Sequence, residues 1–133
     1  MEEYDPVTDT WKKKSDMPTA RGEVALCAIG TKIYAVGGHN TSEKGGTVFR
    51  TVEIYDTLTD TWTKGVDMQS QRYLFSASVV DGKIYSIGGF SFNDLVGFGN
   101  VLSVVDEFDT GFISKSVDPS GKLMKTWGML KAK

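Results

Sequence analysis

Residues 32–38 read KIYAVGG, and residues 83–89 read KIYSIGG. Working outward from this pair, 15 of 35 aligned positions are identical, without a gap, between residues 4–38 and 55–89. A sequence that keeps one register over this length contains an internal repeat. Identical residues 51 positions apart include the pairs Tyr34 and Tyr85, Trp11 and Trp62, and Arg21 and Arg72.

Each copy is predicted to consist of short β-strands joined by turns. Residues 24–29 and 74–80 are apolar runs that hardly alternate, a pattern typical of strands buried on both faces. A turn follows each run, and the second turn, Asp81-Gly82, is a strong two-residue hairpin signal. Residues 52–63 and residues 3–13 are each predicted to form a hairpin around a polar turn.

Glycine pairs and large aromatic residues recur at matching places in the repeat. They are Trp11, Tyr34, Gly37, Gly38, Tyr55, Trp62, Tyr85, Gly88, Gly89 and Trp127. These residues resemble the signature of the kelch motif, and the resemblance covers nearly the whole chain. It implies an all-β fold of kelch-type β-propeller blades, each a four-stranded antiparallel sheet, repeated at about 50 residues. Glycines allow close approach of backbones, and the aromatic rings have the area to fill the space between blades.

The blades are predicted to follow one another with strands a to d running from the central axis outward. Residues 1–14 supply only strands c and d of a partial blade. Residues 15–64 form a full blade, and residues 65–133 form a second one.

The last blade departs from the pattern. Phe108 occupies the place of Tyr55, but the next tryptophan, Trp127, follows after 19 positions instead of 7. We therefore expect an inserted loop at about residues 110–121, within the hairpin of strands c and d.

Two and a half blades form an incomplete ring, because closed propellers have roughly four to eight blades. An open array exposes the apolar flanks on which the next repeats would pack. We expect the chain to be the C-terminal part of a longer kelch propeller, or to close by association with other copies. Two copies would still leave a defect, because neither supplies strands a and b of the partial blade.

Composition excludes several classes of partner and site. Fifteen basic and seventeen acidic residues give a net charge of −2, which provides no field to attract nucleic acid or an anionic membrane. The single cysteine, Cys27, excludes an internal disulfide framework and a cysteine-based zinc cluster. With no signal peptide and no apolar run of about 20 residues, we expect a soluble segment. The compartment stays open, with the cytoplasm favoured.

Partner-binding residues are expected where the long loops gather. Antiparallel strand order places loops 39–50 and 90–100 and the connectors between blades on one face of the propeller, and such loops commonly carry function. The candidate partner-binding residues are Arg21, His39, Asn40, Arg50, Arg72, Tyr73, Phe90, Phe92 and Asn93.

Two interpretations of the repeated arginines stay open. In kelch proteins that bind peptides, arginines at positions resembling Arg21 and Arg72 engage acidic groups, and a guanidinium fits a carboxylate with two parallel donors. Alternatively, these arginines only bridge blade edges and backbone carbonyls. Phe90, Phe92 and Phe98 likewise either form an exposed apolar patch or fold back over their own loop.

No catalytic residue, metal site or cofactor is expected. His39 has no second histidine or cysteine ligand nearby, so a loop hydrogen bond is the favoured use of its imidazole. The Asp5/Asp9 and Asp56/Asp60 pairs lie in tight turns, where an aspartate bonds the backbone two residues on.

The sequence thus favours a non-catalytic kelch-repeat module that binds a protein or peptide through its loop face, with further blades as the other partners. Two alternatives stay open: part of a sugar-acting kelch-like propeller enzyme of the mutarotase type, or a purely structural propeller segment.

Overall fold

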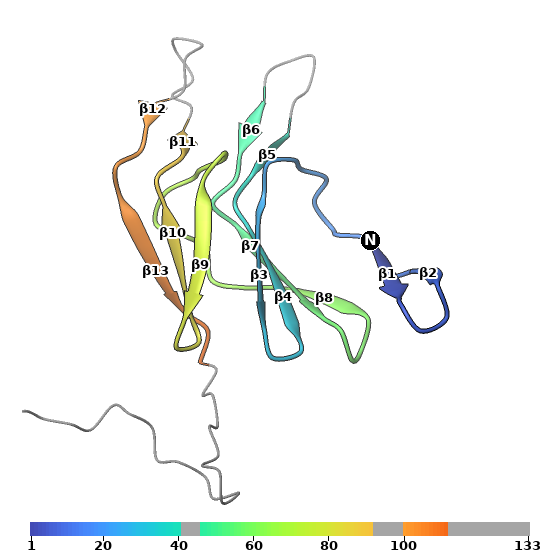
Figure 1. Cartoon of the computed structure of the whole chain (residues 1–133). Coiled ribbons are helices and arrows are strands. Elements are labelled where there is room, and N and C mark those ends of the chain that lie inside the picture. The colour runs from blue at the N-terminus through green and yellow to red at the C-terminus, as the bar shows by residue number, and fades with distance from the viewer. Residues whose placement is uncertain (41–45, 92–99, 112–133) are drawn as a thin grey trace, which may run out of the picture.

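The computed structural model describes residues 1–40, 46–91 and 100–111 (Figure 1). Every regular element in these residues is a β-strand, and every ladder is antiparallel. The described part of the chain contains no helix able to cross a membrane. The predicted all-β class is therefore confirmed, and the sheets do not close into a ring.

The first sheet has four strands in the order β3-β4-β7-β8. Its strands are β3 (Ala25–Ile29), β4 (Lys32–Val36), β7 (Val52–Asp56) and β8 (Thr61–Lys64). Strand β3 lies at the edge that contacts β9 of the following sheet. The first sheet therefore runs outward from that edge in sequence order, as a blade does.

The second sheet has the order β9-β10-β13 and repeats the first. Its strands are β9 (Ser76–Val80), β10 (Lys83–Ile87) and β13 (Val105–Asp109). Asp81 and Gly82 both have positive φ, 50° and 75°, which is the backbone that the predicted two-residue hairpin requires. A fourth strand, expected to lead to Trp127, and the loop at about residues 110–121 fall mainly or wholly outside the described residues.

Each long loop begins and ends in a short ladder. The ladders are formed by β5 (His39–Asn40) with β6 (Thr47–Val48), and by β11 (Phe90–Ser91) with β12 (Asn100–Val101). Sequence reasoning missed these four strands because two residues are too few to show alternation. Both ladders extend from the same end of the two sheets (Figure 1), and we call this end the loop face.

The core lies between the two sheets. One face of the first sheet packs on the second, and the Tyr34 ring meets the Phe108 ring at 6.2 Å with an interplanar angle of 62°. This arrangement buries a continuous apolar cluster, as neighbouring blades are expected to do. The buried members of the cluster are Cys27, Ile29, Tyr34, Val36, Val52, Met68 and Ile84.

The expectation that the inner strands are buried on both faces is wrong for β3 and β9. Leu26 on β3 is 63% exposed and Val80 on β9 is 53% exposed. In each strand the face away from the other sheet has no sheet against it among the described residues. An apolar run therefore indicates burial only where a second sheet covers the strand.

A backbone junction joins the two sheets beside the glycine pair of the first repeat. Gly38 N donates to the carbonyl of Arg72 at 2.9 Å, and Arg72 N donates to the carbonyl of Phe49 at 3.2 Å. A Cβ on Gly37 would lie 2.6 Å from the Arg72 carbonyl oxygen and 2.9 Å from Cε1 of Phe75. Gly37 therefore permits the connector of the second sheet to approach the first sheet closely.

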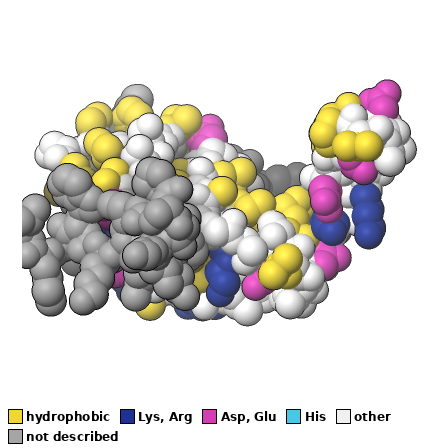
Figure 2. All heavy atoms as spheres, turned by 60° about the horizontal axis from the view of Figure 1, so that its bottom comes forward, with side chains coloured by type: hydrophobic (Ala, Val, Ile, Leu, Met, Phe, Trp, Pro, Cys, Tyr) yellow, Lys and Arg dark blue, Asp and Glu magenta, His cyan; other side chains and the backbone are white. Residues whose placement is uncertain are grey.

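The N-terminal hairpin pairs β1 (Glu2–Asp5) with β2 (Thr10–Lys13) and projects from the rest of the molecule (Figures 1 and 2). The indole of Trp11, which is 67% exposed, lies 5.0 Å from the Tyr4 ring. In the second copy of this pair, Tyr55 and Trp62 lie 5.2 Å apart in the first sheet.

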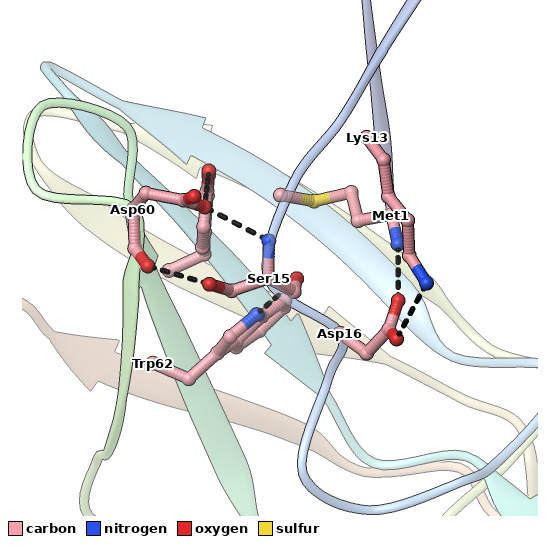
Figure 3. Close-up of polar contacts among 7 residues, drawn as sticks. Met1, Lys13, Ser15, Asp16, Asp60 and Trp62 are labelled. Atoms are coloured by element: carbon pink, nitrogen blue, oxygen red, sulfur yellow. Dashed lines mark hydrogen bonds and ion pairs between the residues drawn. The ribbon is translucent and has the colours of Figure 1, made fainter.

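Ser15 attaches this hairpin to the first sheet (Figure 3). Ser15 N donates to Oδ1 of Asp60 at 2.9 Å, and Ser15 Oγ donates to the Asp60 carbonyl at 2.8 Å. The indole N–H of Trp62 donates to the Ser15 carbonyl at 3.1 Å. Asp60 and Trp62, whose residue types recur in the repeat, thus bind the segment that leads into the first sheet.

Candidate partner-binding face

Three aromatic side chains from different segments meet on the loop face. The rings of His39 and Tyr73 lie 4.9 Å apart, and the rings of Tyr73 and Phe90 lie 6.0 Å apart. All three residues are partly exposed. We call this group the ring row; it brings together three of the residues that the sequence put forward for binding.

Backbone hydrogen bonds hold the ring row in place. Gly22 and His39 exchange two bonds, of 2.8 and 3.0 Å, and Tyr73 and Phe90 exchange two more, of 3.0 and 2.9 Å. His39 directly follows Gly38, which is bonded to the residue before Tyr73. The rings therefore stand on one hydrogen-bonded network that crosses the junction between the sheets.

A carboxylate lies at the His39 end of the ring row. Oε2 of Glu23 is 3.0 Å from Nδ1 of His39, and the Glu23 side chain is 39% exposed. Glu23 adopts φ 50°, and Leu74 takes the same left-handed conformation at the corresponding place in the second repeat. Sequence reasoning missed Glu23, because this charge does not recur in the second repeat and no motif includes it.

The two repeated arginines lie inside the protein. Nη1 of Arg21 donates to the Gly37 carbonyl at 2.9 Å, and its Nη2 lies 2.7 Å from Oε2 of Glu53. Nη1 of Arg72 donates to the Gly88 carbonyl at 3.0 Å, and its Nη2 donates to Oδ2 of Asp106 at 2.6 Å.

Both arginine side chains are fully buried. The geometry is that of the architectural interpretation, in which these residues bridge strands and carbonyls. A buried guanidinium that is already paired with a carboxylate offers no free donor pair to a partner. Arg21 and Arg72 are accordingly left out of the binding surface proposed below.

Each buried arginine also faces an aromatic ring. The Arg21 guanidinium carbon is 5.3 Å from the centre of the Phe49 ring, and that of Arg72 is 5.8 Å from the centre of the Phe75 ring. Sequence reasoning did not single out these two phenylalanines. Phe49 and Phe75 lie at different positions of the repeat, so a comparison of the two copies does not reveal that both contact an arginine.

The remaining candidates have local roles or fall outside the structure. Oδ1 of Asn40 accepts a hydrogen bond from Thr47 N at 3.1 Å within the first ladder. Nε of Arg50 lies 3.5 Å from Oδ2 of Asp67, with its side chain 58% exposed. Phe92, Asn93, Phe98 and Trp127 lie outside the described residues.

Asp5 and Asp56 bond the backbone two residues on, as predicted, whereas Asp9 and Asp60 accept from the hydroxyls of Tyr4 and Tyr55. Oδ1 of Asp5 accepts from Val7 N and Oδ1 of Asp56 accepts from Leu58 N, both at 2.9 Å. The Ser15 N–H, followed by the Tyr55 hydroxyl, lowers the pKa of Asp60. In the described ranges no three His, Cys, Asp or Glu side chains are grouped so as to hold a metal ion.

The two antiparallel sheets and their repeated strand order are those of a β-propeller protein built from blade repeats. The sequence model of the kelch motif matches residues 20–69 and 71–112, which is more than half of the chain, so the chain belongs to the kelch-repeat family.

Among curated relatives, Kelch-like ECH-associated protein 1B of Danio rerio is 34% identical over 89 residues, covering 67% of this chain and 15% of the relative. The F-box/kelch-repeat protein of Arabidopsis thaliana is 32% identical over 102 residues, covering 77% of this chain and 26% of the relative. Kelch-like protein 36 of Bos taurus is 31% identical over 105 residues, covering 77% and 17%. The chain thus spans about a quarter or less of the length of these relatives.

The solved structure of YjhT is similar to this chain with a TM-score of 0.56 and 25% sequence identity. The similarity covers 61% of this chain and 25% of the YjhT chain. The fold similarity therefore extends over most of the chain but over a limited part of that larger structure.

Proposed function

We propose that the chain is a non-catalytic interaction module that binds a protein or peptide through its loop face. The ring row is the observation that supports this function, because it gathers aromatic rings from both repeats on a hydrogen-bonded base. Aromatic residues are enriched at protein interfaces, where they combine apolar area with few rotatable bonds. The name of the Danio rerio relative describes association with another protein, and we extend that type of role to this chain.

The ring row favours binding over catalysis. His39 and the Glu23 carboxylate resemble a base with its orienting group, but the other members of the ring row are the aromatic rings of Tyr73 and Phe90 and not the serine or cysteine nucleophile that such a pair activates. The buried arginines are occupied by internal carboxylates and carbonyls. A sugar-converting activity of the purified chain, retained in His39→Ala, would contradict the non-catalytic part of this proposal.

The experiment compares two serine variants on opposite ends of the molecule. Tyr73→Ser removes the central ring of the row, and Leu58→Ser removes an apolar side chain that is 78% exposed in the turn between β7 and β8. Partners are first identified with the wild-type chain by quantitative proximity labelling, and their affinities are then measured with purified proteins. We expect Tyr73→Ser to weaken binding by about tenfold or more, as an interface anchor does, and Leu58→Ser to leave it unchanged.

Equal affinities for wild type and Tyr73→Ser, with both chains folded, would contradict the loop face as the binding surface. Circular dichroism and the melting temperature of each variant separate a loss of contact from a loss of fold.

We also propose that the unit boundaries are 1–14, 15–64 and 65–133, and that the outer face of the second sheet packs against further kelch blades. Ile87 and Val105 on that face are 47% and 57% exposed. Their counterparts in the first repeat, Val36 and Val52, are buried in the core between the sheets. The same positions therefore have a neighbouring sheet in one repeat and none described in the other.

Light scattering over a range of concentrations tests the proposed open face. We expect the isolated chain to self-associate, and Ile87→Lys combined with Val105→Lys to reduce that association. A wild-type chain that stays monomeric at every concentration and melts cooperatively would contradict the proposal.

A further inference from the structure

The loop face brings a carboxylate close to aromatic rings. The ring row and the Glu23 carboxylate are adjacent, since Glu23 lies 3.0 Å from His39 and the His39 ring lies 4.9 Å from Tyr73. Aromatic faces and carboxylates both attract cations. One segment that lies across His39 and Tyr73 can therefore reach both kinds of group.

The described charges of this face leave one carboxylate, that of Glu23, without a lysine or arginine partner. Arg21 and Arg72 are fully buried, and each is paired with a carboxylate of its own sheet. Arg50 pairs with Asp67. Among the described residues, the one ion-pair partner of Glu23 is an imidazole, which is counted as neutral in the net charge of −2. The described part of the face therefore suits a basic segment better than an acidic one.

The protein contains two internal sites in which a cation contacts both an aromatic ring and a carboxylate. The Arg21 guanidinium lies over the Phe49 ring at 5.3 Å and 2.7 Å from the Glu53 carboxylate. The Arg72 guanidinium lies over the Phe75 ring at 5.8 Å and 2.6 Å from the Asp106 carboxylate. In both cases one planar cation satisfies a ring and a carboxylate together. The ring row with Glu23 supplies the same two kinds of group on the loop face.

We propose that the ring row and Glu23 bind an arginine side chain of a partner peptide. The guanidinium stacks on Tyr73 beside His39 and directs its N–H groups to the Glu23 carboxylate. Arginine is favoured over lysine because a planar guanidinium stacks on a ring and presents paired donors to a carboxylate. This inference rests on the loop face being the binding surface, and it specifies the chemistry of the partner.

A titration followed by nuclear magnetic resonance tests the inference on the full chain. The probes are three blocked tripeptides with free side chains of arginine, citrulline and glutamate, each flanked by glycine. Citrulline keeps the shape of arginine without its charge. We expect the arginine peptide to shift the ring signals of His39, Tyr73 and Phe90, and the citrulline and glutamate peptides to shift them much less.

Two variants assign the effect to the proposed groups. Glu23→Gln should weaken binding of the arginine peptide by about two- to fivefold, the range typical of an exposed ion pair or cation–π contact. The control Glu107→Gln alters an exposed carboxylate on the outer face of the second sheet and should leave the affinity unchanged. Tyr73→Leu keeps an apolar side chain but removes the ring, and it should abolish the shifts at His39.

The inference is overturned if the glutamate peptide binds as well as the arginine peptide, or if Glu23→Gln has no effect on the arginine titration. The proposed function fails separately, through unchanged partner binding in Tyr73→Ser. A partner that depends on Tyr73 but not on Glu23 would leave the loop face as the binding surface and remove arginine as its ligand.

Discussion

The two sheets have nearly the same strand pattern but different surroundings. The face of the first sheet that carries Tyr34 and Val52 packs on the second sheet and is buried. The corresponding face of the second sheet carries Tyr85 and Val105 and is largely exposed. A repeat thus specifies the shape of each sheet, whereas burial depends on whether a neighbour is present.

The side chains on the exposed face also differ. Ile54 in the first sheet corresponds to Glu107 in the second, where the carboxylate accepts from the Tyr85 hydroxyl at 2.8 Å and pairs with Lys83. These contacts lower the pKa of Glu107, with Lys83 as the larger cause. The second sheet therefore replaces part of an apolar packing face with a polar group, and the next element on that side is expected to present polar side chains.

The largest expected effect comes from the buried arginine of the second repeat. Arg72→Ala should lower the free energy of unfolding by about 3–5 kcal/mol, because it leaves the partly buried Asp106 carboxylate without its cation. Urea denaturation measures this loss. Arg50→Ala is the matched control, since Arg50 is exposed and its ion pair should contribute about 1 kcal/mol or less. A loss in Arg72→Ala no larger than that of the control would contradict the structural role of the buried pair.

Glycine substitutions sharpen the comparison between the sheets. Gly37 and Gly88 have φ of 61° and 66°, so alanine should cost about 1–2 kcal/mol at either position from backbone strain alone. A Cβ at Gly37 would also overlap the connector of the second sheet, whereas the nearest heavy atom to a Cβ at Gly88 is 3.5 Å away. We therefore expect a further loss of about 1–3 kcal/mol in Gly37→Ala only.

Equal losses in Gly37→Ala and Gly88→Ala, measured by urea denaturation, would mean that the junction at Gly37 is not closely packed. In a longer chain with another blade on the outer face, Gly88→Ala should approach the cost of Gly37→Ala.

Substitutions of the two tryptophans compare the hairpin that is part of the first sheet with the hairpin that projects from the molecule. Trp62→Phe removes the indole bond to Ser15 and should lower stability by about 1 kcal/mol. Trp11→Phe alters a side chain that is 67% exposed and should change stability by less than about 0.5 kcal/mol. Thermal unfolding of the two variants measures these changes in stability. A larger loss of stability in Trp11→Phe than in Trp62→Phe would contradict the assigned roles.

The smallest expected effect is a local response to acid. The pKa of Asp60 is lowered by the hydrogen bond from Ser15 N and then by the one from the Tyr55 hydroxyl. The stability that these bonds contribute is therefore fully present above the ordinary aspartate pKa of about 3.9. Their contribution is lost as the pH falls through the lower folded value. The amide signal of Ser15 should therefore shift only below about pH 4. An identical shift in Asp60→Asn would show that another group is titrating.

Much of the fold follows from the repeat, because each strand is specified locally by alternation and turn residues. The Asp81-Gly82 turn and the two KIY strands required no knowledge of distant contacts. The burial of β3 and β9 could not be predicted in this way. Whether Leu26 and Val80 are buried depends on a neighbouring sheet, and the sequence of a strand does not say whether that sheet is present. The short ladders of the long loops were missed for lack of length.

The candidate site was only partly predictable. His39, Tyr73 and Phe90 follow from topology, because antiparallel order brings their segments to one face. The burial of Arg21 and Arg72 depends on their pairing with Glu53 and Asp106, which the 51-residue interval does not relate. The spacing from arginine to carboxylate is 32 residues in the first repeat and 34 in the second. These arginine–carboxylate pairs can be identified only from a structure, in which segments from different parts of the repeat lie side by side.

The most direct test is a nuclear Overhauser experiment on the folded chain, with aromatic side chains assigned by specific labelling. Packing of the two sheets as neighbouring blades predicts cross-peaks between the rings of Tyr34 and Phe108, and between those of His39 and Tyr73. A well-dispersed spectrum in which both cross-peaks are absent would contradict the junction between the sheets and, with it, the ring row.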